Sequence, residues 1–292
     1  MKKIAIVDIK GGFGNQIFQF AFANEIKKLG YKVYINKSFY DFKNKITKDS
    51  TYRELILHEN NFNFQKAGNT LLVFFKVLTR LNLSNKTKWF FKYFDKVFIR
   101  YDDYNFDSSK LNHKFVYLDG YWQNIEYLNN NLDFIKQSIS NDIKIKKSLN
   151  SPINKNETLL IVRRGDYIDM KEDLDITFYK EALNYFEKLD LEVNLNIFTD
   201  DVDWVNKNKL FDIAKNVYGP EDSSEGVIDL FSKMITNEHY IICNSTFALI
   251  AAILAEKKSS HVLIADPWMR NYKNEKLFKS NWIKIKNTRP KY

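Results

Sequence analysis

The sequence contains very little cysteine, glycine and proline. Its 292 residues include a single cysteine, Cys243, with nine glycines and four prolines. One thiol excludes an intramolecular disulfide framework and any metal cluster that needs several cysteines. Few glycines and prolines exclude long flexible or proline-rich linkers. These shortages favour a compactly folded protein from a reducing compartment, and we predict a cytoplasmic location.

Long apolar runs and an export signal are also lacking. The apolar stretch Leu71–Phe75 is far shorter than the roughly 20 residues that a membrane-spanning helix needs. The apolar residues before Asp8 are too few for the core of a secretory signal. Contact with the membrane, if any, is therefore expected to be peripheral and at the inner face.

The composition is nevertheless sufficient for a large core. Apolar residues make up 45% of the chain and aromatic residues 16%, which excludes general disorder. The balance of 45 Lys and Arg against 36 Asp and Glu gives a formal charge of +9 and favours partners that carry phosphate or acidic sugars. A nucleic-acid partner has only this charge in its favour, because no known nucleic-acid-binding motif accompanies the lysines.

Patterning divides the chain into two α/β halves. The first begins with a strand at Ile4–Val7, a glycine-rich loop, a helix at Gln16–Leu29 and a strand at Tyr31–Ile35, the order of a βαβ unit. The polar segment Asn141–Glu157 separates it from a second half in which strands and helices alternate regularly. We predict domains at 1–150 and 151–292, with parallel sheets whose ligands gather beyond the carboxyl ends of the strands.

Two arginines follow the first strand of the second half. Arg163 and Arg164 come directly after the apolar run that ends at Val162. A guanidinium presents a planar fork of donors that fits phosphate oxygens, so this position suits a phosphate ligand. Asp166 can pair with one arginine and orient it. The alternative is an Arg–Asp ion pair that only holds the loop.

Polar residues follow two further strands of the second half. Asn244, Ser245 and Thr246 lie at the start of an apolar helix. They suit capping of that helix, binding of a diphosphate, or both. Asp200 ends another strand and suits either a cap or a contact to a base or sugar. Asp229 is either a surface charge or a carboxylate directed at the ligand. The glycine-rich loop at 11–16 suits an anion or an ordinary tight turn, and its spacing does not match dinucleotide or nucleoside triphosphate motifs.

Five blocks in this order resemble the bacterial α-1,2-fucosyltransferases of glycosyltransferase family 11. They are Gly-Gly-Phe-Gly-Asn-Gln-Ile-Phe-Gln-Phe-Ala-Phe (11–22), Gly-Tyr-Trp-Gln (120–123), Arg-Arg-Gly-Asp-Tyr (163–167), Phe-Thr-Asp-Asp (198–201) and Asn-Ser-Thr-Phe (244–247). The resemblance implies a GT-B-like α/β fold of two Rossmann-like domains facing a cleft. It makes 1–150 the acceptor-side domain and 151–292 the domain that binds the nucleotide sugar.

The resemblance also implies a reaction. The expected activity is inverting transfer of L-fucose from GDP-L-fucose to a galactoside hydroxyl of a surface polysaccharide or lipooligosaccharide, in α-1,2 linkage and without a metal or other cofactor. Arg163 is then the arginine on the β-phosphate, and Arg163 and Asp166 form the catalytic pair. The predicted donor-binding residues are Gly14, Asn15, Gln16, Arg163, Arg164, Asp200, Asp229, Asn244, Ser245, Thr246 and Phe247.

Three alternatives stay open. The family usually has a histidine two residues before the first arginine, where this chain has Ile161. The departure leaves room for another GDP-sugar donor, or for a homologue that binds GDP or glycan without catalysis. Two Asp-x-Asp triplets, at 173–175 and 201–203, would suit a divalent cation, although Arg163 and a helix start offer a metal-free route.

Two functional features have no clear sequence signal. No histidine lies in the five blocks, so the base that deprotonates the acceptor is not identified. The run from Lys76 to Arg100 has seven positive residues and one acid among many aromatics, and it suits either an anionic membrane surface or an amphipathic helical pair.

Overall fold

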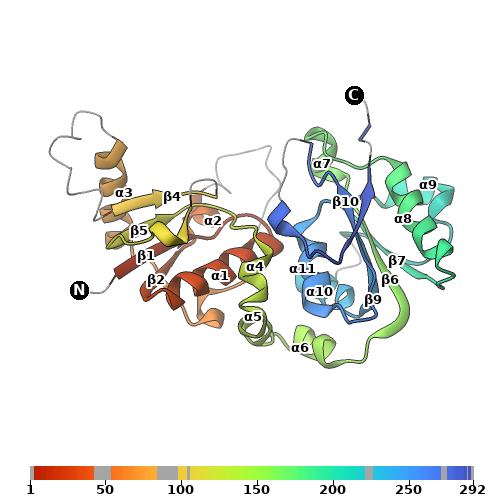
Figure 1. Ribbon diagram of the computed structural model, residues 1–292, viewed down its shortest axis with the longest axis horizontal. Coiled ribbons are helices and arrows are strands. Elements are labelled where there is room, and N and C mark those ends of the chain that lie inside the picture. Colours follow the sequence, from red (N-terminus) through yellow and green to blue (C-terminus); the bar gives the residue numbers. More distant parts are fainter. Residues whose placement is uncertain are drawn as a thin grey trace. The chain divides into compact units, whose positions relative to one another are not determined.

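The chain folds into two compact units, Met1–Ser138 and Ile139–Tyr292 (Figure 1). The computed structural model describes residues 3–42, 54–83, 98–103, 106–220, 226–270, 275–287 and 289–290. The sequence predicts a division after residue 150. The structure assigns helix α6 (Ile143–Asn150) to the second unit because this helix packs against α10 (Val227–Met234).

A five-stranded parallel sheet forms the first unit, with the strand order β3-β2-β1-β5-β4. Its described elements are β1 (Lys3–Asp8), α1 (Phe13–Lys28), β2 (Tyr31–Asn36), α2 (Ser38–Phe42), β3 (Gln65–Lys66), α3 (Asn69–Leu83), β4 (Phe98–Tyr101), β5 (Phe115–Leu118), α4 (Ile125–Asn129) and α5 (Leu132–Ile139), with 3-10 turns at Glu59–Phe62 and Ser108–Lys110. The central strand β1 is fully buried from Ala5 to Val7, which explains its unbroken apolar sequence.

The region between β2 and β5 differs from its prediction. The sequence predicts mainly helix from Phe39 to about Arg100, whereas the structure adds the short strands β3 and β4 at the two edges of the sheet. Phe75 and Leu78 of α3 pack on Ile6 and Phe98, so this part of the basic aromatic run contributes to the core. Residues 84–97 of that run lie outside the described part of the chain.

No described helix combines the length and the apolar character that crossing a bilayer would require.

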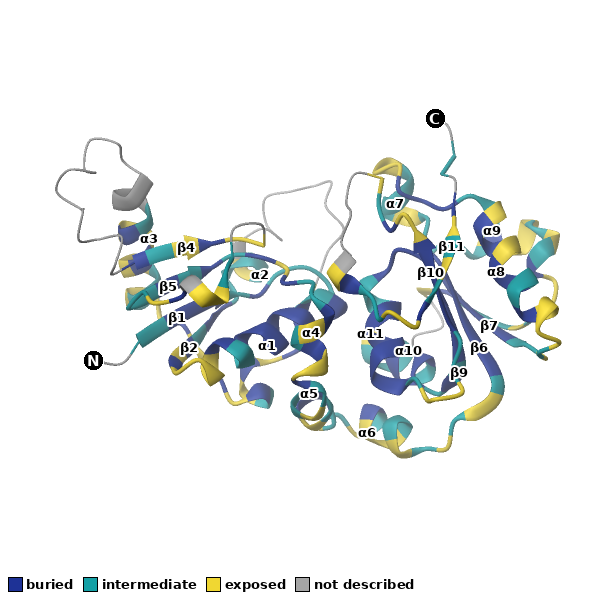
Figure 2. Cartoon of the chain, in the orientation of Figure 1, coloured by how far each residue is buried: buried dark blue, intermediate teal, exposed yellow. Residues whose placement is uncertain are grey.

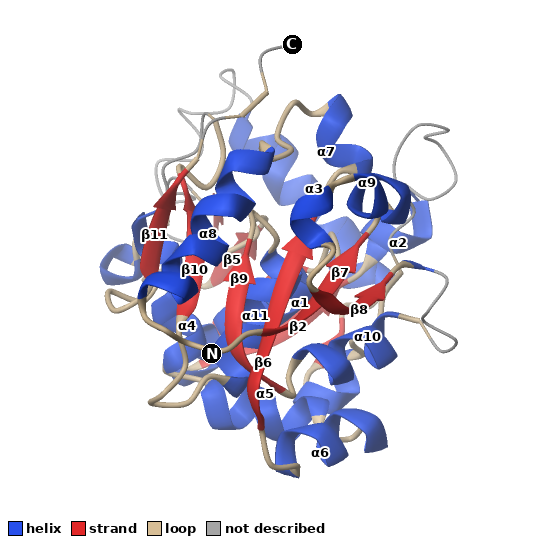
Figure 3. Ribbon diagram, turned by 90° about the vertical axis from the view of Figure 1, so that its right-hand side faces the viewer, coloured by secondary structure: helices blue, strands red, loops and turns tan. Residues whose placement is uncertain are grey.

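The second unit contains a six-stranded parallel sheet with the order β11-β10-β9-β6-β7-β8, visible side by side in Figure 3. Besides α6 and α10, its described elements are β6 (Asn154–Val162), α7 (Gly165–Asp169), α8 (Ile176–Lys188), β7 (Asn194–Thr199), α9 (Val202–Lys207), β8 (Ala214–Tyr218), β9 (Asn237–Ile242), α11 (Thr246–Ala255), β10 (Val262–Asp266) and β11 (Ile283–Lys286), with 3-10 turns at Lys209–Phe211 and Glu275–Leu277. The two parallel sheets confirm the predicted GT-B-like α/β class.

Burial explains why the second unit could be predicted well. Helix α11 is apolar on all sides, and every residue from Ala248 to Ala255 is buried (Figure 2). Strand β6 lies between β7 and β9 and is buried from Glu157 to Val162. This central position places the residues that follow β6 between those that follow its two neighbours.

Candidate functional site

Arg163 lies at the centre of a polar cluster beyond the carboxyl end of β6. Its Nη1 is 3.0 Å from Oδ2 of Asp200, and its Nη2 is 2.6 Å from Oδ1 of Asp166. The guanidinium also lies over the ring of Tyr167, with its carbon 5.0 Å from the ring centroid. The two acids come from the segment after β7 and from α7, so the arginine is held in one orientation from two sides.

The charge of Arg163 is secured by these neighbours. Burial alone would lower its pKa, but the carboxylates of Asp200 and Asp166 raise it overall. About a quarter of the side chain stays accessible, at 25% exposure. A guanidinium has five N–H donors, and two ion pairs do not exhaust them. The arrangement therefore supplies a permanent, oriented cation at the ligand edge of the sheet.

Arg164 is less exposed than Arg163 and is held by different partners. Its Nε is 3.0 Å from Oδ2 of Asp201, and its Nη1 is 3.3 Å from Oδ2 of Asp173. Its guanidinium carbon lies 4.5 Å from the centroid of the Trp204 ring. These contacts use the first acids of both Asp-x-Asp triplets, so Arg164 neutralises carboxylates that the sequence offered as metal ligands.

Asp200 joins the two arginines, and it does not cap α9. Its Oδ1 accepts a hydrogen bond of 2.7 Å from the backbone N–H of Arg164, while Oδ2 pairs with Arg163. Asp201 is the capping residue, since its side chain accepts from the backbone N–H of Trp204 at 2.9 Å. A side chain at Gly165 would place its Cβ 2.9 Å from Asp200 Oδ2, so it would displace the carboxylate from this position.

The segment after β9 completes the edge on the other side of β6. The amide of Asn244 donates to the carbonyl of Glu172 at 2.7 Å, and the hydroxyl of Tyr167 donates to the carbonyl of Asn244 at 3.0 Å. The buried Oδ1 of Asn244 has no hydrogen-bond partner among the described residues. Tyr167 thus connects this segment to Arg163.

The start of α11 contains the other three predicted residues. Ser245 occupies the N-cap position, as the sequence predicted, although its hydroxyl makes no capping hydrogen bond. Thr246 is the first residue of the helix, and the ring of Phe247 packs on Phe231 with centroids 5.6 Å apart. The first N–H groups of a helix have no intrahelical partner, so a helix start of this kind can bind an anion.

Asp229 belongs to a separate ion cluster on α10. Its carboxylate lies 2.9 Å from Nζ of Lys233 and 3.3 Å from Nζ of Lys144 on α6. The hydrogen bond from Lys233, opposed by burial and supported by Lys144, lowers the pKa of Asp229. The carboxylate is therefore ionised at neutral pH, and it connects α6 to α10.

The three predicted residues of the glycine-rich segment belong to the first unit. Helix α1 begins at Phe13, earlier than predicted, so Gly14, Asn15 and Gln16 are all helical. Asn15 Oδ1 accepts a hydrogen bond of 2.9 Å from Nε2 of Gln123, and Gly14 is buried. Gln16 is fully buried, and its side chain bonds to four backbone groups of its own unit.

The family model for glycosyl transferase family 11 matches residues 4–286. The chain belongs to this family. As a family 11 enzyme it is a glycosyltransferase, as the five sequence blocks predicted.

Two curated relatives of this family 11 chain come from Escherichia coli. The chain is 25% identical to the O-antigen biosynthesis glycosyltransferase WbnK over 316 aligned positions, which cover 95% of this chain and 99% of the relative. It is 24% identical to an alpha-1,2-colitosyltransferase, with 91% and 92% covered. Among solved structures, the fucosyltransferase NodZ from Bradyrhizobium aligns at 14% identity with a TM-score of 0.45, covering 87% of this chain and 93% of NodZ.

Several contact residues of the family 11 enzyme were not predicted as site residues. Tyr167, Asp173, Asp201 and Trp204 hold the two arginines. The sequence indicated Asp173 and Asp201 only as possible metal ligands, and it gave no signal for Trp204. In the first unit, Asp8 and Asp119 end two neighbouring strands. Ligands bind beyond the carboxyl ends of parallel strands, and this rule would have predicted both acids as site residues. No group of three or more metal-ligating side chains occurs among the described residues.

Cys243 lies near Arg163, and its thiol is expected to be unreactive. It is fully buried, and burial raises the pKa of its thiol to about 12. Because the thiolate is the reactive form, we expect almost no alkylation of the native enzyme by iodoacetamide at pH 8 and complete alkylation in guanidinium chloride. Mass spectrometry of both samples measures the difference. Rapid stoichiometric labelling of the native enzyme would contradict the burial of this residue.

Proposed function

We propose that this glycosyltransferase transfers L-fucose from GDP-L-fucose to O2 of a galactoside, with inversion and without a metal ion. The observation that carries the proposal is Arg163, oriented by Asp166 and Asp200 at the carboxyl end of the central strand β6. One relative is named as an alpha-1,2-colitosyltransferase, which supports the α-1,2 linkage. WbnK is named for O-antigen biosynthesis, which supports a surface polysaccharide as the acceptor.

The proposed role of Arg163 is to stabilise the leaving group. As the bond between the sugar and the β-phosphate breaks, negative charge grows on the phosphate while the sugar becomes oxocarbenium-like. A fixed cation that needs no reorganisation at that moment stabilises this charge, and one such donor contributes about 10²–10³ in rate. Asp166 and Asp200 act as positioning residues, because they set the direction of the guanidinium.

The remaining donor contacts follow from the same edge of the sheet. The N-terminus of α11, with Ser245 and Thr246, supplies N–H groups and hydroxyls for the diphosphate. The unpartnered Oδ1 of Asn244 offers an acceptor to a donor hydroxyl or base amine. Arg164, Phe247 and Asp229 complete the proposed set, the last near the guanine. Gly14 and Asn15, in the first turn of α1, are also proposed as donor contacts.

A metal ion is not required in this proposal. The arginine and the helix start provide the positive potential that a divalent cation provides elsewhere. Asp173 and Asp201 already pair with Arg164. Transfer is therefore expected to continue at an unchanged rate in the presence of EDTA.

A donor panel tests the proposal. The purified enzyme is incubated with N-acetyllactosamine, EDTA and either GDP-L-fucose, GDP-colitose or GDP-mannose, and GDP release and product mass are measured. We expect efficient transfer from GDP-L-fucose. Preference for GDP-colitose would assign the second candidate, which the colitosyltransferase relative and the departure at Ile161 favour. Binding of GDP without transfer from any donor, across several galactosides, would show a non-catalytic homologue.

A further inference from the structure

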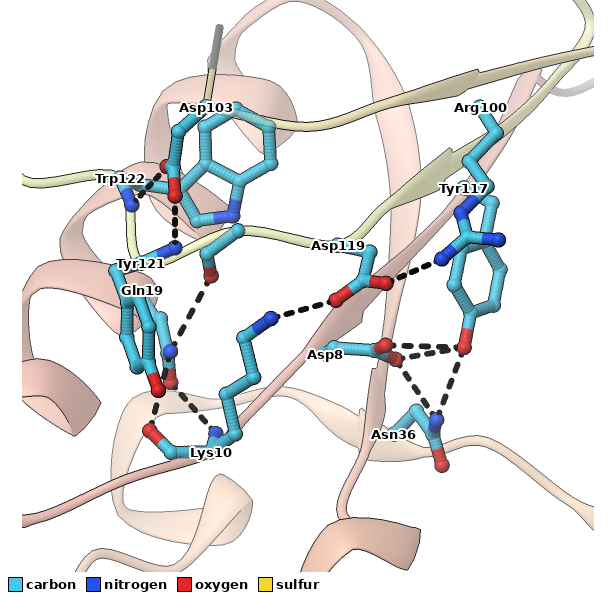
Figure 4. Close-up of polar contacts among 11 residues, drawn as sticks. Asp8, Lys10, Gln19, Asn36, Arg100, Asp103, Tyr117, Asp119, Tyr121 and Trp122 are labelled. Atoms are coloured by element: carbon cyan, nitrogen blue, oxygen red, sulfur yellow. Dashed lines mark hydrogen bonds and ion pairs between the residues drawn. The ribbon is translucent and has the colours of Figure 1, made fainter.

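A second polar cluster lies at the carboxyl edge of the sheet in the first unit. Asp8 ends β1, Asn36 ends β2, and Asp119 directly follows β5 (Figure 4). The register pairs Asp8 with Asn36, and β1 runs beside β5. All three residues belong to the first unit, so their arrangement does not depend on the second. Three neighbouring strands thus bring polar side chains to the edge where parallel sheets bind ligands.

Two neutral donors hold the carboxylate of Asp8. The hydroxyl of Tyr117 donates to Oδ1 at 2.8 Å and lies 3.1 Å from Oδ2, and Asn36 Nδ2 donates to Oδ1 at 2.7 Å. Asp8 is partly accessible, while Asn36 is buried. A carboxylate offers about four lone-pair sites, so these contacts fix its orientation and leave room for a further donor.

The cations of the cluster pair with the other carboxylate. Lys10 Nζ lies 2.7 Å from Asp119 Oδ1, and Arg100 Nη2 lies 2.5 Å from Asp119 Oδ2. Among the described residues, Asp8 has no ion-pair partner. The side chains of Lys10 and Asp119 are each 23% exposed. An ammonium has three N–H donors, and one carboxylate partner leaves Lys10 able to donate to a ligand.

An exposed aromatic ring adjoins these groups. Tyr121 is 38% exposed, and the Nζ of Lys10 lies 5.0 Å from its ring centroid. Asp103 accepts hydrogen bonds from the backbone N–H groups of Tyr121 and Trp122, which fixes the turn that carries the ring (Figure 4). An apolar surface is therefore held in place next to the ammonium.

The charges of the cluster favour a neutral ligand. Lys10 and Arg100 balance Asp8 and Asp119, and both cations already pair with Asp119. A phosphate would meet the carboxylate of Asp8 without a cation of its own. A divalent cation needs about six oxygen ligands, and the described residues place no group of metal-ligating side chains here. A hydroxyl both donates and accepts, so a ligand rich in hydroxyls suits Asp8 and Lys10 together.

We propose that this cluster binds a neutral sugar of the acceptor glycan, with one sugar hydroxyl donating to Asp8, another accepting from Lys10, and the apolar face of the sugar against Tyr121. A pyranose has hydroxyls around its edge and C–H groups on its faces, so a single ring can make all three contacts. The identity of the sugar rests on the proposed function, which makes it the galactose of the acceptor.

Binding of N-acetyllactosamine to the full chain tests the role of Asp8. Ligand-observed NMR titrations with GDP present measure the Kd at pH 7.5. Asp8→Asn keeps the shape of the side chain and removes its charge, so we expect the Kd to rise about 10–100-fold, the loss of a hydrogen bond to a charged group. Asp133→Asn makes the same change at an exposed position of α5 and should leave the Kd unchanged.

Two substitutions of Tyr121 test the aromatic contact. Tyr121→Ala removes the ring, so we expect the Kd to rise about 3–10-fold. Tyr121→Phe keeps the apolar face and should stay within about twofold of wild type. Saturation transfer from the protein to the C–H protons of galactose should fall in Tyr121→Ala and persist in Tyr121→Phe. A merely structural role of the ring would not alter this signal.

Binding is also expected to depend on pH through Asp8. Burial raises the pKa of Asp8 to about 6; the hydrogen bond from Asn36 opposes this shift, the charge of Asp119 adds to it, and Tyr117 and Lys10 oppose it. The ionised carboxylate is the stronger acceptor, and it is present at pH 7 and lost as the pH falls through 6. The Kd of wild type should therefore rise between pH 7 and pH 5, and the Kd of Asp8→Asn should stay constant.

The outcomes separate this inference from the proposed function. If wild type transfers fucose while Asp8→Asn and Tyr121→Ala bind N-acetyllactosamine as tightly as wild type, the sugar site alone is overturned. If wild type binds the disaccharide, both variants lose it and no donor of the panel supports transfer, the sugar site stands and the proposed function is overturned. Absence of binding by wild type overturns the sugar site. Melting curves establish that the variants are folded, and the two Tyr121 variants decide the outcome if Asp8→Asn is unfolded.

Discussion

Replacement of Arg163 by alanine is expected to lower fucosyl transfer by about 10²–10³-fold, the loss that follows removal of one preorganised donor from a developing anion. The side chain is the only cation shared by Asp166 and Asp200 among the described ion pairs. Alanine removes the charge that faces the leaving group and leaves both acids without their guanidinium. The effect should therefore appear mainly in kcat, measured from initial rates at saturating GDP-L-fucose.

Two other substitutions define the cause of the Arg163→Ala effect. Arg163→Lys keeps a positive charge but loses the planar fork that meets both acids, so we expect recovery of only part of the rate. Lys258→Ala removes one positive charge from an exposed position of the same unit and should leave the rate unchanged. Equal rates for wild type and Arg163→Ala would show that the leaving group is stabilised elsewhere.

Replacement of Gln16 by leucine is expected to destabilise the first unit strongly. The fully buried amide donates to the carbonyls of Gly11 and Glu54 at 3.2 and 2.9 Å. Its oxygen accepts from the N–H groups of Ile56 and Leu57 at 3.1 and 3.0 Å. Leucine would leave these backbone groups unsatisfied in the interior, at a cost of about 2–4 kcal/mol in the free energy of unfolding.

Thermal unfolding measures the Gln16→Leu effect. A loss of this size corresponds to a fall in Tm of roughly 6–16 °C for a unit of this size. Gln137→Leu makes the same chemical change at an exposed position of α5 and should shift Tm by less than about 2 °C. An unchanged Tm together with a weaker affinity for GDP-L-fucose would instead support the predicted donor contact of Gln16.

Helices and strands could be predicted where a single hydrophobic pattern extends over the whole element. The sequence predicts a helix at Thr246–Ala255 and a strand at Phe115–Leu118, and the structure has both with these bounds. Each is a continuous apolar or β-branched run between polar residues. Strands β4 and β11 were missed. Each is a four-residue edge strand that is stabilised by pairing with a distant neighbour, a signal that local periodicity does not contain.

The candidate site could be predicted in its position but only partly in its contacts. Asp166 was expected to pair with one of the two arginines that precede it, and the structure shows that its partner is Arg163. Asp200 and Asp201 are adjacent acids that both suit a helix cap, so the sequence could not show that Asp201 caps α9 while Asp200 bonds to the arginines. Gln16 has a hydrophilic side chain, and its burial depends on the segment at 54–57, far along the chain.

The most direct test of the proposed fucosyl transfer is the structure of the product made from GDP-L-fucose and N-acetyllactosamine in EDTA. NMR spectroscopy of the purified trisaccharide identifies the anomeric configuration and the acceptor oxygen. We expect an α-L-fucosyl residue on O2 of galactose, formed by wild type and lost in parallel in Arg163→Ala. A β-linked product, attachment at another hydroxyl, or a requirement for a divalent cation would contradict the proposed reaction.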